Sequence, residues 1–360
     1  MGAALCLAAS PAIAADPTDV LVDPPTPAAT PEPEGSPAAG AATVTSTDTV
    51  TGETPASGKD WSASLTVETS IGLGTFVSEP QRQSSVTTAF VPSFSYKLAK
   101  DLSIRAGFSV VWYNVLDYAT PLPENEFLMS DLAFTLAHGR IWKHDDSGFT
   151  LSGALTLSLP TSLASQFQNR LFTLAPSLSA RLPVGPVTFA YTLGFGKYFN
   201  TTASSTVNCD DFDDPAECRQ GREDNPDQGY ESERRGAEVY LPGSGSSSFY
   251  VQNGLSVTWE IVEGLNLGLG VTIYNTFGTR SFEVDGLSSE HATSGRSQTD
   301  RLISSLELSY DVLKQLTVGV SLVTGTTQPF GEQGNDLVIF DFSRASDNIT
   351  SLNFSLTGTL

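Results

Sequence analysis

The sequence predicts an all-β fold: a 12-stranded antiparallel transmembrane up-and-down β-barrel with a disordered N-terminal leader. Three observations support this. Apolar and polar residues alternate in short segments that recur about a dozen times along the chain. The polar positions are mostly Ser, Thr and Gly. The connections between the segments alternate in length, which is typical of barrels that are threaded up and down through a membrane.

The two-residue alternation is clearest at the end of the chain. Residues 352–360 have Leu, Phe or Gly at even positions and Asn, Ser or Thr at odd positions. Successive side chains of a β-strand point to opposite faces, so each segment has one apolar face and one hydroxyl-rich face. The polar face of a soluble sheet would carry many Lys and Glu, but only 16% of this chain is charged. This composition favours a barrel with lipid outside and a polar lumen inside.

Twelve segments carry this pattern, and most of them exceed the 9–11 residues that a tilted strand needs to cross a membrane. No run of about 18 apolar residues follows the first few positions, so no transmembrane helix is predicted. The predicted strands are 61–75, 85–98, 102–116, 127–142, 149–159, 170–182, 187–199, 247–262, 265–277, 300–312, 316–326 and 349–360.

The connections divide into five short turns and six longer loops. Barrels of the bacterial outer membrane have an even strand number, short periplasmic turns and longer outside loops. Twelve strands with both termini in the periplasm fit that scheme. The short turns are 99–101, 143–148, 183–186, 263–264 and 313–315, and the loops are 76–84, 117–126, 160–169, 200–246, 278–299 and 327–348.

With these features, residues 61–360 resemble an outer-membrane β-barrel protein of a Gram-negative bacterium. The resemblance is one of architecture and indicates no narrower family. It implies an outer-membrane location, contact with lipid and lipopolysaccharide, and insertion by the barrel assembly machinery. The final strand resembles the C-terminal signal that this machinery reads, although Leu360 stands where Phe or Trp is usual.

The N-terminal region is expected to lie outside the barrel. Residues 1–15 form an apolar stretch that ends in Ala12-Ile13-Ala14, which predicts a signal peptide whose removal would take Cys6 with it. Residues 16–60 are rich in Pro, Ala, Thr, Ser and Glu and predict a disordered periplasmic linker.

Few ionisable residues fall on the polar face of the predicted strands. Such charges either line an aqueous path and bias its selectivity, or pair across the lumen and brace it. A long loop could fold in and plug the lumen, and the loop 200–246 is the candidate. The predicted lumenal charges are Glu68, Arg105, Asp131, Arg181 and Glu307.

These features favour a narrow passive channel for small polar or ionic solutes. The alternative is a plugged structural or surface-interaction barrel without transport. A hydrolase at the outer rim is a third possibility, but none of His138, His144 and His291 has a Ser and a carboxylate at a suitable spacing. We therefore predict no catalytic residues and no enzyme, and the sequence leaves the solute and the oligomeric state open.

The loop 200–246 contains Cys209 and Cys218, the two cysteines that remain after removal of residues 1–15. An even pair in an exported chain predicts a disulfide. The Asp and Glu residues around them are spaced like part of a calcium loop but lack its register, so a solvated acidic loop is the default and no metal or cofactor is predicted. A net charge of −21 disfavours nucleic acid.

Overall fold

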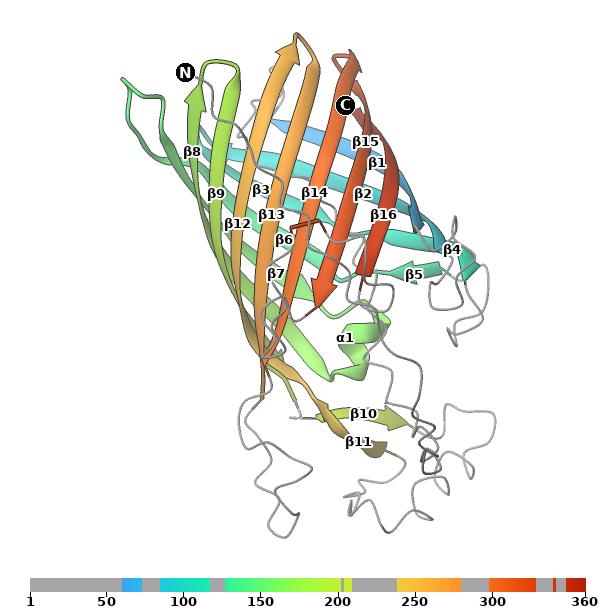
Figure 1. Cartoon of the computed structure of the whole chain (residues 1–360). Helices are drawn as coiled ribbons and strands as arrows, with labels where there is room; N and C mark the ends of the chain where they lie inside the picture. Colours follow the sequence, from blue (N-terminus) through green and yellow to red (C-terminus); the bar gives the residue numbers. More distant parts are fainter. Residues whose placement is uncertain are drawn as a thin grey trace, which may run out of the picture. The chain divides into compact units, whose positions relative to one another are not determined.

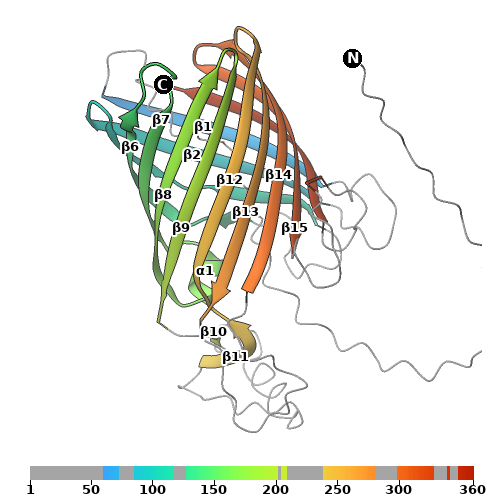
Figure 2. The same ribbon diagram turned by 60° about the vertical axis from the view of Figure 1, so that its left-hand side comes forward.

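The computed structural model describes residues 60–72, 85–116, 127–201, 204–208, 238–279, 298–327, 339–340 and 348–360. Its main sheet is antiparallel and closed, because β1 pairs with β16 on one side and with β2 on the other. Fourteen segments make up this sheet. Two of its strands are interrupted: β3 and β4 are the halves of one, and β5 and β6 are the halves of the other. The wall is therefore a closed 12-strand barrel (Figures 1 and 2).

The predicted strands are confirmed, with ends that differ by a few residues. The wall segments are β1 Trp61–Gly72, β2 Ser85–Ala99, β3 Leu102–Gly107, β4 Val110–Leu116, β5 Phe127–Met129, β6 Leu132–Lys143, β7 Thr150–Leu159, β8 Arg170–Val184, β9 Val187–Asn200, β12 Ser247–Val262, β13 Leu265–Gly278, β14 Gln298–Leu313, β15 Leu316–Thr327 and β16 Asn348–Thr359. Between β9 and β12, β10 Ser204–Asn208 and β11 Glu238–Gly245 form a separate hairpin. Between β7 and β8 lies a short helix, α1 Leu163–Phe167, where a loop without regular structure was expected.

The two interrupted strands correct the prediction of continuous strands over 102–116 and 127–142. The register places the break between β3 and β4 opposite Pro92, which has no N–H to donate to the ladder. The break between β5 and β6 lies beside it. There, the Ser130 N–H donates to the Ser109 carbonyl at 2.8 Å, and the Ser130 hydroxyl accepts the Ser109 N–H at 2.7 Å. Asp131 also lies in this break, so the regular strand register does not fix its side chain.

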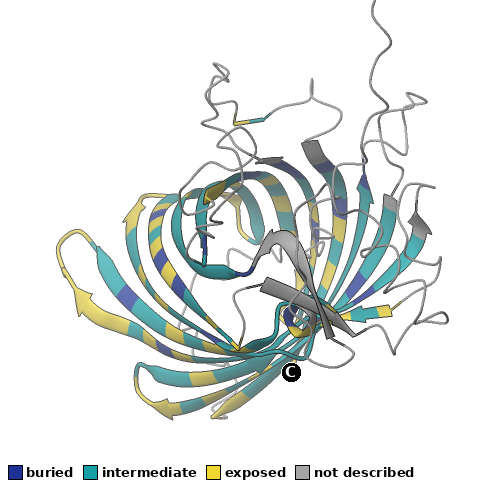
Figure 3. Cartoon of the chain, turned by 90° about the horizontal axis from the view of Figure 1, so that it is seen from below, coloured by how far each residue is buried: buried dark blue, intermediate teal, exposed yellow. Residues whose placement is uncertain are grey.

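The outer face of the wall is apolar. Leu65, Leu193 and Leu255 are 47%, 45% and 55% exposed, and they alternate with residues that are less exposed. Figure 3 shows the same alternation of exposed and less exposed positions along the strands. Large apolar side chains that are this exposed suit a wall surrounded by lipid.

The inner face carries small hydroxyl side chains that bond to one another across neighbouring strands. Ser64 and Ser93 are 2.7 Å apart between β1 and β2. Thr135 and Thr156 are 2.9 Å apart between β6 and β7, and Ser179 and Thr192 are 2.9 Å apart between β8 and β9. These lumenal hydroxyls are thus hydrogen-bonded within the wall itself.

The two ends of the barrel differ. The turns β2–β3, β6–β7, β8–β9, β12–β13 and β14–β15 lie at one end, which we call the short-turn end, and α1 and the β10–β11 hairpin lie at the opposite, long-loop end (Figures 1 and 2). The positive φ of Gly185 and Gly264, 58° and 78°, suits tight two-residue turns. Leu360 also lies at the short-turn end, because its N–H donates to the Ala63 carbonyl at 2.8 Å near the start of β1.

Stacked aromatic side chains occur on the outer face near both ends. Trp61 and Phe94 stack near the short-turn end, with ring centroids 6.3 Å apart. Near the long-loop end, the Phe249 and Phe277 rings are 4.6 Å apart. Aromatic belts at both interfaces are typical of membrane barrels, and the wall is that of an outer-membrane protein. Among the described residues, no helix is long and apolar enough to cross a membrane.

The outward assignment of Leu255 is testable. Leu255→Arg places a charge on the outer face in the middle of β12, and we expect it to lower the free energy of unfolding by about 2–4 kcal/mol. The neighbouring Ser256→Arg, on the lumenal face, is the matched control and should cost clearly less. Urea unfolding in phospholipid vesicles measures both. An equal loss in the two variants would contradict the assigned faces.

A second prediction concerns the short turn that contains Asp101. Arg140 Nη2 donates to Asp101 Oδ1 at 2.8 Å, and this hydrogen bond lowers the pKa of Asp101 below its usual range. Because the folded-state pKa is the lower one, the pair stabilises the fold at neutral pH, and this contribution is lost as the pH falls below about 4. The effect is small because the pair is exposed. Asp101→Asn and Arg140→Gln should each flatten the acid side of the stability profile, and an unchanged profile would exclude the pair as its source.

Candidate functional site

Three tyrosines lie in a row on the lumenal face near the long-loop end. Tyr198, Tyr250 and Tyr274 come from the neighbouring strands β9, β12 and β13, at positions opposite to the exposed residues of the same strands. The ring centroids are 5.6 Å apart between the first pair and 6.1 Å apart between the second. We call these residues the tyrosine row.

A glycine makes room for the middle ring. A Cβ atom built on Gly196 would overlap the ring of Tyr250, so the ring occupies the space where a side chain of β9 would stand. The ring therefore leans over the neighbouring strand and lies against the wall. Two positions earlier, Gly194 makes similar room for Gln252, whose Oε1 would lie 3.0 Å from such a Cβ.

Arginines stand at both ends of the tyrosine row. The Arg170 guanidinium lies over the ring of Tyr198, with Cζ 4.2 Å from the ring centroid, which is the geometry of a cation–π contact. Arg301 is opposite Tyr274 in the β13–β14 register and interacts with it electrostatically. The lumen thus carries a continuous strip of aromatic and guanidinium groups along β8, β9, β12, β13 and β14.

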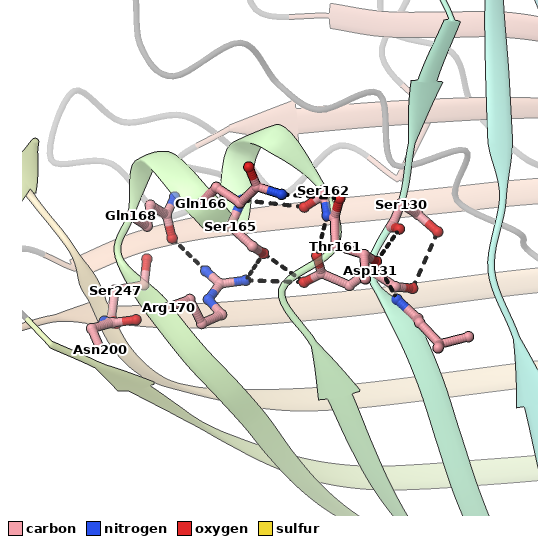
Figure 4. Close-up of polar contacts among 11 residues, drawn as sticks. Ser130, Asp131, Thr161, Ser162, Ser165, Gln166, Gln168, Arg170, Asn200 and Ser247 are labelled. Atoms are coloured by element: carbon pink, nitrogen blue, oxygen red, sulfur yellow. Dashed lines mark hydrogen bonds and ion pairs between the residues drawn. The ribbon is translucent and has the colours of Figure 1, made fainter. Parts of the chain in front are cut away.

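Asp131 connects this strip to α1. Its Oδ1 accepts the Ser162 N–H at 3.0 Å, and its Oδ2 accepts the Ser165 hydroxyl at 2.5 Å (Figure 4). Arg170 Nη1 donates to the same Ser165 hydroxyl at 2.9 Å and lies 3.7 Å from Asp131 Oδ2. Arg170 Nη2 also donates to Gln168 Oε1. We call Asp131, Ser165 and Arg170 the polar network.

Two of the three predicted lumenal carboxyls, Glu68 and Glu307, lie on one arc of the wall. Glu68 is on β1 and Glu307 is on β14, with β15 and β16 between them. The Glu307 side chain reaches over Gly319 of β15, because its Oε1 is only 3.8 Å from where a Cβ of that glycine would be. The two carboxyl groups interact as like charges.

The predicted lumenal arginines lie on another arc. Arg105 is on β3 and Arg181 is on β8, with β6 and β7 between them. One strand, β2, separates the arcs on one side, and β9, β12 and β13 separate them on the other. The basic arc therefore lies roughly across the lumen from the acidic arc. That these charges act as one electrostatic set stays a prediction.

Asp131 has surroundings that the sequence did not indicate. It lies in the strand break and bonds to α1 and Arg170, instead of standing in a strand on the lumenal wall. The tyrosine row and Arg170 were not predicted. Two signals in the sequence were available. The three tyrosines share the parity of the polar residues in their strands, which places them on the lumenal face. Ser162 shortly after Pro160 is a common start for a helix.

The other predicted residues take no part in this site. Cys209, Cys218 and His291 lie outside the described residues, so the disulfide stays a prediction. His138 is exposed on the outer face of β6. His144 Nδ1 is 3.1 Å from the Ser147 hydroxyl in an exposed short turn. That hydroxyl also accepts the Phe149 N–H, which is the geometry of a capped turn.

No family model matches the sequence, and no curated protein matches it. Among solved structures, the chain is similar to an outer membrane channel from Pseudomonas putida F1, with 10% identity and a TM-score of 0.48 over 86% of this chain and 98% of that one. It is also similar to the NanC porin (9% identity, TM-score 0.42) and the KdgM porin (9%, 0.38), each over 82% of this chain and 98% of the other. These similarities indicate no particular solute for this chain. The closed wall and its apolar outer face identify the architecture as an outer-membrane β-barrel.

The packing of Tyr250 on Gly196 is testable by a double-mutant cycle. Gly196→Ala should lower the free energy of unfolding by about 1–3 kcal/mol, because the added methyl group displaces the ring. In the Tyr250→Ala background the same substitution should cost much less, which gives a coupling free energy between the two positions. Gly254→Ala, whose added Cβ would approach Thr272 Oγ1 at 3.3 Å, is the matched control. Equal costs of Gly196→Ala in both backgrounds would exclude the contact.

Proposed function

We propose that this protein is a passive channel for small polar or ionic solutes across the outer membrane. The observation that carries the proposal is the separation of lumenal charge, with Glu68 and Glu307 on one arc and Arg105 and Arg181 on the arc roughly opposite. Opposite charges on facing walls create a field across the lumen. Such a field orients dipolar solutes and offers separate paths to cations and anions.

Glycines on the lumenal face support this function. Gly194, Gly254, Gly268 and Gly270 lie between the two arcs and Gly319 lies on the acidic arc, and all five have the parity of the lumenal face. A barrel of eight strands is filled by its own side chains, and one of sixteen leaves a water-filled channel. A 12-strand wall lined by glycine and hydroxyl residues leaves space for a narrow path.

A plugged structural barrel is the second candidate. It is favoured by the polar network, in which Asp131 and Arg170 hold the segment between β7 and β8 at the long-loop end, while Arg170 also lies over Tyr198. A hydrolase has less support, because the His144–Ser147 pair is part of a capped turn. We further propose that the short-turn end faces the periplasm, that lipopolysaccharide surrounds the long-loop end and that the barrel assembly machinery inserts the chain.

Ion selectivity tests the channel proposal. The refolded full chain should conduct in planar bilayers, and reversal potentials in a salt gradient should measure its preference for cations or anions. Glu68→Gln and Glu307→Gln remove negative charge at constant size, so they should shift the preference toward anions. Arg105→Gln and Arg181→Gln should shift it toward cations.

Ser64→Gln is a neutral control on the same lumenal face as Glu68, and it should leave the reversal potential unchanged. Absence of current from the folded wild-type barrel would favour the plugged alternative. Current with the same reversal potential in all charge variants would leave a pore but exclude the assigned charges as its selectivity elements.

A further inference from the structure

The segment between β7 and β8 is fixed to the wall at both ends. At its start, the Thr161 hydroxyl donates to the Ser130 carbonyl at 2.9 Å and accepts the Leu132 N–H at 2.8 Å. At its end, the Asn169 carbonyl accepts the Thr201 N–H at 2.9 Å. Asn169 has a φ of 50°, a left-handed conformation in which the chain reverses before β8. Residues 162–168 therefore lie between two points that are fixed to the wall.

Polar contacts hold this middle part in place. Ser165 is the central residue: it is 2% exposed and bonds to both Asp131 and Arg170. Leu163 of α1 is 51% exposed, so it adds little apolar packing. A five-residue helix has negligible stability of its own, so its position depends on these side-chain contacts.

The same contacts connect the segment to the lumen. Arg170 begins β8, and its guanidinium lies between the ring of Tyr198 and the other two members of the polar network, Asp131 and Ser165. Its Nε is buried and has no hydrogen-bond partner among the described residues, so the closed arrangement leaves one donor of the guanidinium unpaired. Hydrogen bonds to charged groups are stronger than neutral ones, but water competes for the same donors and acceptors once it reaches them, so their net contribution is smaller.

We propose that residues 162–168 act as a latch at the long-loop end of the barrel: the polar network holds the segment at the wall beside the lumenal tyrosine row, and release of the network moves it away and widens the path. This inference rests on the proposed channel function and concerns its regulation. Fixed ends and a middle part held by side-chain polar contacts are the features that allow a segment to switch between two positions.

Thiol labelling tests the movement without relying on conduction. In the full chain, Ala164→Cys places a thiol at a half-buried position of the segment that is not part of the polar network, and mass spectrometry locates the label apart from the native cysteines. Adding Asp131→Asn should raise the labelling rate at position 164 by about tenfold or more, because it weakens the hydrogen bonds that hold the segment. Ser152→Cys, at a lumenal position of β7 that is 3% exposed, is the matched control and should stay protected in both backgrounds.

Single-channel recording tests the consequence of the movement. Asp131→Asn should spend more time than the wild type at a higher conductance level. An oxidised cross-link between Asp131→Cys and Ser165→Cys should hold the channel at the lower level until it is reduced. A wild type without current beside a conducting Asp131→Asn variant would also support the latch.

Two results would overturn the latch. One is an unchanged labelling rate at position 164 in the Asp131→Asn background. The other is faster labelling with conductance levels that are identical to those of the wild type, because the segment would then move without affecting the path. If no variant conducts, the channel proposal fails by itself, and the labelling rate still decides whether the segment is released.

Discussion

Closure of the sheet is the constraint on which the rest of the structure depends. A strand in lipid must pair every backbone N–H and C=O, and an open sheet leaves two edges unpaired. Here, β16 at the end of the chain pairs along β1 at the start of the wall, from Ser64 opposite Thr359 to Gly72 opposite Ser351. This pairing joins residues almost 300 positions apart. Once it forms, every side chain is assigned either to lipid or to the lumen.

The functional features arise where this regular pairing is interrupted. Pro92 has no N–H to donate to the strand beside it, and that strand is interrupted between β3 and β4. The next strand is interrupted at Ser130, which bonds to Ser109 in the first break. The Asp131 side chain then bonds to α1 instead of taking a fixed place in the wall. The missing N–H of Pro92 is thus connected, through the two interrupted strands, to the segment between β7 and β8.

Glycines on the lumenal face decide how the large side chains lie. Without a Cβ at Gly196, the Tyr250 ring can lie over the neighbouring strand, and without one at Gly319, the Ser355 side chain of β16 has room. In both cases a residue on one strand takes the position left empty on the next. The glycines of the lumenal face are therefore both the source of lumenal space and the support of the groups that enter it.

The fold class, the strand number and the side chains that face lipid follow from the sequence alone, because alternation along a strand is a local property that one-dimensional order preserves. The same alternation places Glu68 and Arg105 on the lumenal parity of their strands. Which of these residues become neighbours depends on the tertiary structure. Arg170, Tyr198 and Asp131 are adjacent because strands pair laterally with a stagger, and the break at Ser130 and the glycine positions set that arrangement. Parity gives the face of each residue, but its height and partners depend on the register of the closed barrel.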